Sequence, residues 1–105
     1  ALAMEVILAG RFLTAQEALR AGLVNHVVPV ELYLEKAIEI AATIAQKPPV
    51  AVRLAKEAIV RALDVPLEEG LDFERRNFWL LFATEDKEEG VRAFLEKRPG
   101  RWKGR

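Results

Sequence analysis

The feature that most constrains the fold is a helical spacing of apolar residues that proline and glycine interrupt at a few points. Between residues 31 and 46, apolar side chains recur at intervals of three and four, at Leu34, Ala37, Ile38, Ala41, Ile44 and Ala45. This spacing predicts a helix with one apolar face. Lys47-Pro48-Pro49 ends that helix, because a residue before proline is driven out of the α region. We therefore place a domain boundary between residues 46 and 47.

The chain after this boundary predicts two packed helices. The first, from about Pro49 to Leu63, carries a stripe of small side chains at Ala51, Ala55, Ala58 and Ala62. Such a stripe lets a second helix approach closely. Pro66 is expected as the first residue of that second helix. The aromatic residues between Phe73 and Phe82 exceed what a helical hairpin can bury, so we interpret the surplus as an interface with a neighbouring subunit.

A last helix is predicted to begin after Thr84, which is a good N-cap residue. Acidic side chains occupy its first turns and basic side chains its last, at Lys97 and Arg98, an order that suits the helix dipole. The apolar residues Val91, Phe94 and Leu95 are expected to form its inner face.

Residues 1–46 predict shorter elements. Residues 1–8 are mostly apolar and have no capping residue before them, so we expect a helix cut within its length and deprived of its covering surface. Gly10 is expected to cap the C-terminus of this helix. Thr14 and Glu17 have the spacing of a capping box at the start of a short second helix. Residues 23–28, rich in β-branched side chains, predict an extended or short strand segment.

Bulk composition excludes several kinds of protein. The chain has 105 residues, and its 16 basic and 16 acidic side chains balance, which gives no indication of a nucleic-acid or membrane partner. With no cysteine and one histidine, disulfides and cysteine-rich or histidine-rich metal sites are excluded. No apolar run is long enough to span a bilayer, and residues 1–8 do not have the pattern of a signal peptide. We therefore expect a cytoplasmic protein.

No catalytic residue and no metal ligand is assigned from the sequence. A general acid needs an apolar surround to raise its pKa, whereas the glutamates cluster on helix faces that we expect to be exposed. We interpret these residues as solvated or capping: Glu68, Glu69, Glu74, Glu85, Glu88 and Glu89. His26 lies in the extended segment, where we expect a half-buried structural side chain.

The basic C-terminal tail permits three interpretations. Trp102 is surrounded by five basic residues: Lys97, Arg98, Arg101, Lys103 and Arg105. This cluster is either a solvated terminus that complements a helix end, or an anion site for a phosphorylated ligand with Lys97 as a point charge. Nucleic-acid binding is the third interpretation, but no basic face elsewhere extends such a footprint.

Six stretches occur in an order and spacing that is specific as a set: MEVILAGR (4–11), TAQEA (14–18), AGLVN (21–25), AKEA (55–58), FATEDKEEG (82–90) and AFLEKR (93–98). Together they resemble the C-terminal part of crotonase-family (enoyl-CoA hydratase/isomerase) enzymes. The resemblance implies a mainly α-helical segment of an α/β fold built on a ββα spiral. Residues 1–46 would end the spiral core, and residues 47–105 would form the helical region that makes trimers, or hexamers of two stacked trimers.

The resemblance also implies acyl-CoA thioesters as substrates, with no tightly bound cofactor. In this family two backbone amides stabilise a thioester enolate, and two glutamates handle the water that adds to the 2,3 double bond. The family pattern places these groups before residue 1, so we expect this segment alone to be inactive. Lys97 matches a lysine that reaches the CoA phosphates and adenine of an adjacent subunit. Phe78 matches an aromatic residue near the CoA or acyl site, with plain helix packing as the alternative.

Two hypotheses for the function follow. The first is the oligomerising and CoA-contacting portion of an enoyl-CoA hydratase or isomerase. The alternative is a helical self-association module that has no chemistry of its own. The alanine stripe and the aromatic surface fit both, and affinity for CoA separates them.

Overall fold

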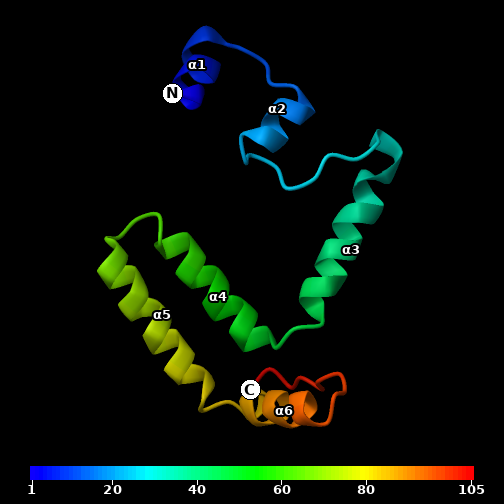
Figure 1. Ribbon diagram of the computed structural model, residues 1–105, viewed down its shortest axis with the longest axis vertical. Coiled ribbons are helices and arrows are strands. Elements are labelled where there is room, and N and C mark those ends of the chain that lie inside the picture. Colours follow the sequence, from blue (N-terminus) through cyan, green and yellow to red (C-terminus); the bar gives the residue numbers. More distant parts are fainter. The chain divides into compact units, whose positions relative to one another are not determined.

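The computed structural model describes all residues 1–105 and contains helices and connecting segments only (Figure 1). The elements in chain order are α1 (Leu2–Ala9), α2 (Ala15–Arg20), η1 (Val30–Leu32), α3 (Tyr33–Ala45), α4 (Pro49–Arg61), α5 (Leu67–Leu81) and α6 (Glu85–Leu95). This confirms the mainly α-helical prediction. The chain divides into two compact units, Ala1–Ile38 and Glu39–Arg105. The division lies within α3, whereas the predicted boundary at 46 and 47 coincides with the link between α3 and α4.

Local capping explains the bounds of the first two helices. Gly10 adopts the left-handed conformation, with φ 62° and ψ 29°, and its amide donates to the Val6 carbonyl at the end of α1. The predicted capping box begins α2: Thr14 Oγ1 accepts the Glu17 amide at 3.2 Å, and the Thr14 amide donates to Glu17 Oε2 at 2.9 Å. The hydrogen bond from the Thr14 amide is the largest cause that lowers the pKa of Glu17 to about 2. Arg11 then joins α1 to α2, with salt bridges to Glu5 at 3.2 Å and to Glu17 at 2.6 Å.

Residues 23–28 form no strand, which corrects one of the two predicted forms of this segment. β-Branched side chains favour extended backbone, but a strand also needs a neighbouring strand to accept and donate its backbone hydrogen bonds. No segment of this chain pairs with it as a strand. His26 is exposed rather than half-buried, whereas its neighbours Val27 and Val28 are half-buried.

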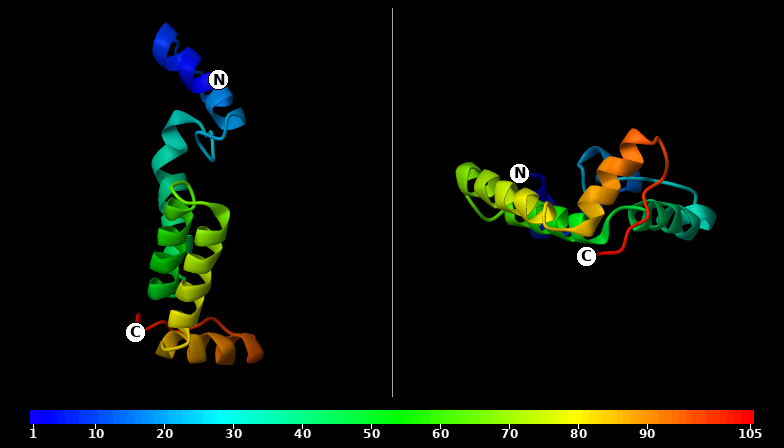
Figure 2. Two further views of the ribbon diagram at one scale, coloured as in Figure 1. Left: turned by 90° about the vertical axis from the view of Figure 1, so that its left-hand side faces the viewer. Right: turned by 90° about the horizontal axis from the view of Figure 1, so that it is seen from below.

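Helices α4 and α5 contact each other and pack side by side as an antiparallel hairpin, as the left view of Figure 2 shows. The alanine stripe of α4 faces α5, and Leu54 is buried between them. The side chain of Asn77 in α5 is also buried, and its Nδ2 donates to the Leu54 carbonyl at 3.3 Å. Near the end of the hairpin where the loop joins the two helices, the Arg61 guanidinium lies 4.8 Å from the ring centre of Phe73. Pro66 precedes the first helical residue of α5 by one position, which corrects the predicted start.

Helix α6 begins as predicted, because Thr84 Oγ1 accepts the Lys87 amide at 3.2 Å. The helix ends at Leu95, so Lys97 and Arg98 lie beyond its last turn rather than within it. The apolar residues predicted for its inner face, Val91, Phe94 and Leu95, line one groove with side chains of α5, but all three are exposed. The buried positions of α6 are Asp86 and Ala93, because the C-terminal tail, rather than another helix, covers that face.

The apolar faces of the helices are largely uncovered. Buried apolar side chains are few, namely Ala18, Leu54 and Ala93. Large apolar side chains such as Ile7, Phe12 and Leu63 are each at least 75% exposed. None of the helices combines the length and the apolar character that crossing a membrane requires. Apolar side chains exposed in such numbers are typical of surfaces that proteins cover by contact with other chains or segments.

Candidate functional site

Lys97 lies at the turn that ends α6. Its φ of 52° is the one positive φ of a residue other than glycine in the chain. The Lys97 amide donates to the Phe94 carbonyl at 3.2 Å and the Arg98 amide to the Ala93 carbonyl at 3.0 Å. These two bonds form a Schellman motif, in which glycine is the usual residue at the left-handed position. Lysine costs about 1–2 kcal/mol there, because its Cβ approaches the backbone.

The residues that flank Lys97 form a salt-bridge cluster around the Arg98 guanidinium. Its two terminal nitrogens donate to both carboxylate oxygens of Glu89, at 2.6 and 3.1 Å. Its Nε donates to Glu96 Oε2 at 2.5 Å. The Arg101 amide adds a third hydrogen bond to Glu89, at 2.9 Å. The Glu89 side chain is only 18% exposed, so the predicted solvated residue is instead the centre of this cluster.

These contacts account for the acidity of Glu89. Hydrogen bonds from Arg98, followed by that from the Arg101 amide, lower the pKa of Glu89 from its ordinary 4.5 to about 2. The same contacts, those from Glu89 first and from Glu96 second, raise the pKa of Arg98. Both side chains are therefore ionised throughout the physiological pH range, and the pair is bidentate.

The backbone of the tail after Arg98 folds back over α6, while most side chains of residues 101–105 are exposed. The carboxylate of Asp86, which is 4% exposed, accepts the Lys103 amide at 2.7 Å and the Gly104 amide at 2.9 Å. The carbonyl of Arg105 accepts the Glu85 amide at 2.8 Å, so the tail also satisfies an unpaired donor at the start of α6. The sequence analysis missed this role of Asp86, because an acidic residue in a first turn has the ordinary pattern of a helix-dipole partner.

The structure separates the five basic residues of the tail into two groups. Arg98 is neutralised by Glu89 and Glu96, and Lys103 and Arg105 both pair with Glu85, at 2.8 and 3.0 Å. The Lys103 hydrogen bond is the largest cause that lowers the pKa of Glu85. Two side chains, Lys97 and Arg101, form no salt bridge with any carboxylate in the chain.

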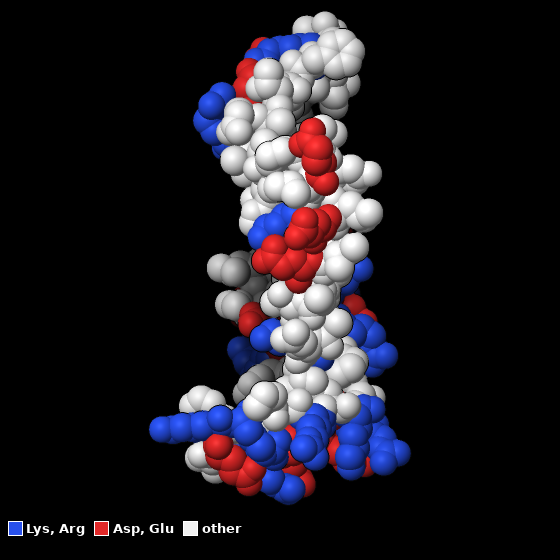
Figure 3. Space-filling view, turned by 90° about the vertical axis from the view of Figure 1, so that its right-hand side faces the viewer, with Lys and Arg blue, Asp and Glu red and all other residues white.

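Basic and acidic side chains alternate over the tail and α6 rather than forming one basic face (Figure 3). Lys97 and Arg101 are both exposed. Lys97 directly precedes the neutralised Arg98 in sequence, and Arg101 follows it by three positions. Of the five residues of the predicted anion site, these two are the ones whose charge remains available to an outside anion. The mixed surface weighs against the nucleic-acid interpretation, because a backbone footprint needs a continuous run of positive charge.

Phe78 lies between two apolar grooves of the C-terminal unit. One, of about 530 Å³, separates α4 from α5, and we call it the α4–α5 groove. The other, of about 480 Å³, is lined by Phe78, Phe82, Phe94 and Trp102 among others, and we call it the α5–α6 groove. Phe78 is 55% exposed and stacks edge-to-face on Phe82, with ring centres 5.2 Å apart. Its packing within this chain is therefore partial, and much of its ring remains open to a ligand or a second chain.

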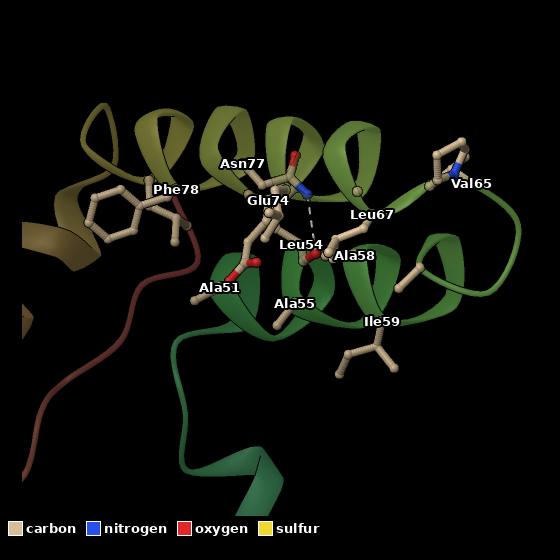
Figure 4. Close-up of a pocket in the computed structure, with 15 residues that line it drawn as sticks. Ala51, Leu54, Ala55, Ala58, Ile59, Val65, Leu67, Glu74, Asn77 and Phe78 are labelled. Carbon is tan, nitrogen blue, oxygen red and sulfur yellow. Dashed lines mark hydrogen bonds between the residues drawn. The ribbon is translucent and has the colours of Figure 1, made fainter.

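A single carboxylate lines the α4–α5 groove. Figure 4 shows Glu74 and Asn77 reaching from α5 toward α4, with the hydrogen bond from Asn77 to the Leu54 carbonyl between them. No second acidic residue lines this groove, and Glu74 itself is exposed. Acid–base addition of water needs two groups placed on one substrate. No group of three or more acidic, histidine or cysteine side chains is placed to hold a metal ion.

Comparison with known proteins identifies relatives along the whole chain. The sequence model described as "Enoyl-CoA hydratase/isomerase" matches residues 1–105. A 2,3-dehydroadipyl-CoA hydratase of Escherichia coli is 46% identical over 104 residues, which are 99% of this chain and 41% of that protein. A mitochondrial enoyl-CoA hydratase of Pongo abelii is 42% identical over 102 residues, which are 97% of this chain and 35% of that protein.

Solved structures agree with the sequence matches. The crystal structure of an enoyl-CoA hydratase from Bacillus anthracis superposes with a TM-score of 0.95 at 50% identity, over 100% of this chain and 41% of that one. An enoyl-CoA hydratase from Geobacillus kaustophilus superposes with a TM-score of 0.93 at 49% identity, over 99% of this chain and 40% of that one. The chain thus spans about two fifths of the length of the relatives it matches.

Proposed function

This chain belongs to the enoyl-CoA hydratase/isomerase family, and from that premise we propose that it is the oligomerising and CoA-contacting part of an enzyme that adds water to 2-enoyl-CoA thioesters. The resemblance proposed from the sequence is confirmed by the match over residues 1–105. The observation that carries the CoA-contacting role is the Lys97 ammonium, which is exposed, unpaired and kept in a costly backbone conformation. An outside anion, such as a phosphate of CoA, is the partner that such a charge lacks.

We propose that Phe78 contributes apolar contact to the same ligand or to the subunit that binds it. Its ring is more than half exposed and lies at the meeting point of two apolar grooves. An aromatic ring offers a large apolar surface with few rotatable bonds, which favours contact with an acyl chain or a neighbouring helix. Phe78 is therefore assigned as a contact residue and not as a catalytic one.

Self-association is supported by the uncovered apolar side chains of α5 and α6. Trp79 and Leu80 of α5 are 62% and 60% exposed, and Phe94 of α6 is 81% exposed. Because burying apolar area contributes about 25 cal/mol per Å², a second copy of this chain gains stability by covering these side chains. We propose a trimer, or a hexamer of two trimers, as the assembly. No membrane and no nucleic acid is proposed as a partner.

The chemical step is assigned to residues outside this chain. The groove that Glu57 and Asp64 both line also holds three cations, Arg53, Lys56 and Arg61. The glutamates with lowered pKa are held by arginine, lysine or backbone donors. A carboxylate that is already ionised and hydrogen-bonded is a poor general acid at neutral pH. We therefore propose that these 105 residues alone are inactive and that the substrate is a CoA thioester with no further cofactor.

The test is hydration of crotonyl-CoA, followed as the loss of enoyl absorbance. The full protein is expected to turn over, and a sample of the 105-residue chain, with its intact mass verified, is not. Substitution Lys97→Met in the full protein is expected to raise KM about tenfold with kcat unchanged, since a remote charge binds ground state and transition state equally. Turnover by the 105-residue chain would place the catalytic carboxylates among those that we regard as structural.

The self-association module is the second candidate, and the exposed apolar faces favour it equally well. It predicts oligomers in sedimentation experiments together with no affinity for CoA. Calorimetric titration of the full protein with CoA separates the two candidates. Binding that weakens in Lys97→Met supports the enzyme part, whereas oligomers that bind no CoA support the module.

A further inference from the structure

We propose that Glu89 is a positioning residue that holds the Lys97 ammonium in place for its anionic ligand. The inference rests on the proposed function of Lys97 and extends it to a residue that touches no ligand itself. It is drawn from the salt-bridge cluster of Glu89, Arg98 and Glu96. Two members of this cluster, Glu96 and Arg98, are the sequence neighbours of Lys97.

The first step concerns the backbone of Lys97. A left-handed lysine is retained only where its surroundings determine the conformation, because the same residue relaxes when those surroundings are lost. The turn has two backbone hydrogen bonds, from Lys97 to Phe94 and from Arg98 to Ala93. The second of these needs Arg98 to stay against the end of α6. Glu89 provides that restraint, because it lies inside α6 and binds the Arg98 guanidinium with both oxygens.

The second step concerns the charge of Lys97. Glu96 is the acidic residue next to Lys97, and it would reduce the attraction for an outside anion if the two paired. Glu96 instead accepts Arg98 Nε at 2.5 Å. Arg98 therefore keeps the neighbouring carboxylate engaged, and Glu89 keeps Arg98 in the place where it does so. The Lys97 ammonium has no carboxylate partner as a result.

The contacts of Glu89 distinguish it from the other acidic residues of α6. Glu89 receives three hydrogen bonds, two from Arg98 and one from the Arg101 amide, and its side chain is 18% exposed. Glu88, one position earlier, is exposed and forms no salt bridge with any residue of the chain. The two glutamates carry the same charge on the same helix, so Glu88 is the matched control.

The test is a double-mutant cycle in the full protein with CoA as the titrated ligand. We expect Lys97→Met to weaken CoA binding about tenfold and Glu89→Gln about fivefold. If Glu89 acts through Lys97, the double variant binds no more weakly than Lys97→Met alone, because the positioned group is already gone. Glu88→Gln is expected to leave the Kd unchanged. In turnover of crotonyl-CoA, Glu89→Gln is expected to raise KM while kcat stays the same.

Three outcomes would overturn the proposal. Additive losses in the cycle would mean that Glu89 affects binding by another route. A Kd of Glu89→Gln equal to that of the unsubstituted protein would leave Lys97 as a ligand contact but remove the positioning role. An unchanged Kd in Lys97→Met would remove both the proposed contact and its positioning. Should Glu89→Gln fail to fold, Arg98→Lys takes its place in the cycle, since lysine keeps the charge but lacks the fork that binds two oxygens.

Discussion

The indole Nε1 of Trp102 donates a hydrogen bond of 2.6 Å to the carbonyl oxygen of Gln46, and the two residues are 56 positions apart. Gln46 follows the last residue of α3, so the bond ties the C-terminal tail to the link between α3 and α4. The indole also lies against Gly90 of α6, where an added Cβ would be 3.6 Å from the ring. One side chain thus connects three parts of the C-terminal unit.

Substitution Gly100→Ala is expected to break this connection. A Cβ at residue 100 would lie 2.2 Å from the Trp102 ring, so the indole must move and its bond to Gln46 is lost. We expect a loss of about 1–3 kcal/mol in the free energy of unfolding, measured by urea denaturation of the full protein. Gly70→Ala in α5 is the control, because its Cβ would meet only Val65 at 3.7 Å. That control is expected to gain about 0.5–1 kcal/mol. Equal effects of the two substitutions would contradict the packing of Trp102.

Substitution Asp86→Asn is expected to release the end of the tail. The buried carboxylate accepts two amides, those of Lys103 and Gly104, whereas an asparagine would point its own N–H groups at one of these donors. We expect a loss of about 1–3 kcal/mol of stability, together with faster cleavage of the tail in limited proteolysis. Glu88→Gln, an exposed neighbour, is expected to change neither measurement. If the tail of Asp86→Asn resists the protease as well as the unsubstituted tail does, the amides of Lys103 and Gly104 have other hydrogen-bond acceptors.

The stability of the protein is expected to fall in acid partly through Glu89. Its pKa is lowered from 4.5 to about 2 in the folded chain, so its ionised form contributes stability that is fully present above pH 4.5. That contribution is lost as the pH falls from about 4.5 through about 2, because in this range the unfolded chain binds a proton at Glu89 that the folded chain does not. Urea denaturation at several pH values is expected to show a smaller slope in this range for Glu89→Gln than for the unsubstituted protein. An identical slope for both would mean that Glu89 does not titrate as its contacts require.

Substitution Lys97→Gly is expected to separate stability from ligand binding. Glycine adopts φ of 52° without the Cβ contact that lysine makes, so we expect a gain of about 1 kcal/mol in unfolding free energy. The same substitution is expected to weaken CoA binding, since it removes the unpaired ammonium. Calorimetric titration and thermal unfolding of one preparation measure both effects. A protein that is destabilised while binding CoA unchanged would contradict both the strain and the assigned role of Lys97.

The local signals in the sequence predicted most of the helix bounds. Thr14 and Thr84 cap α2 and α6 as their spacing indicated, and Gly10 ends α1 in the left-handed conformation. The site was predicted less completely. Lys97 was proposed both as a charge of the basic tail and from the family resemblance, and its role stays a prediction. Glu89 was interpreted as a solvated or capping residue and the acidic first turn of α6 as a helix-dipole partner. Their contacts lie 9 to 18 positions away in sequence, and no pattern within one helix indicates such pairs.

What the sequence by itself determined is the helical course of the chain, its breaks at proline and glycine, and its membership of the family. The helices and their breaks depend on interactions between residues within about one helical turn of each other, which the order of residues specifies directly. Only the tertiary structure decided which of the tail cations remain unpaired, that Asp86 is buried, and that the apolar face of α6 is uncovered. The reason is physical: a salt bridge or a buried surface forms only where the path of the backbone brings distant side chains together, and that path is set by packing between helices.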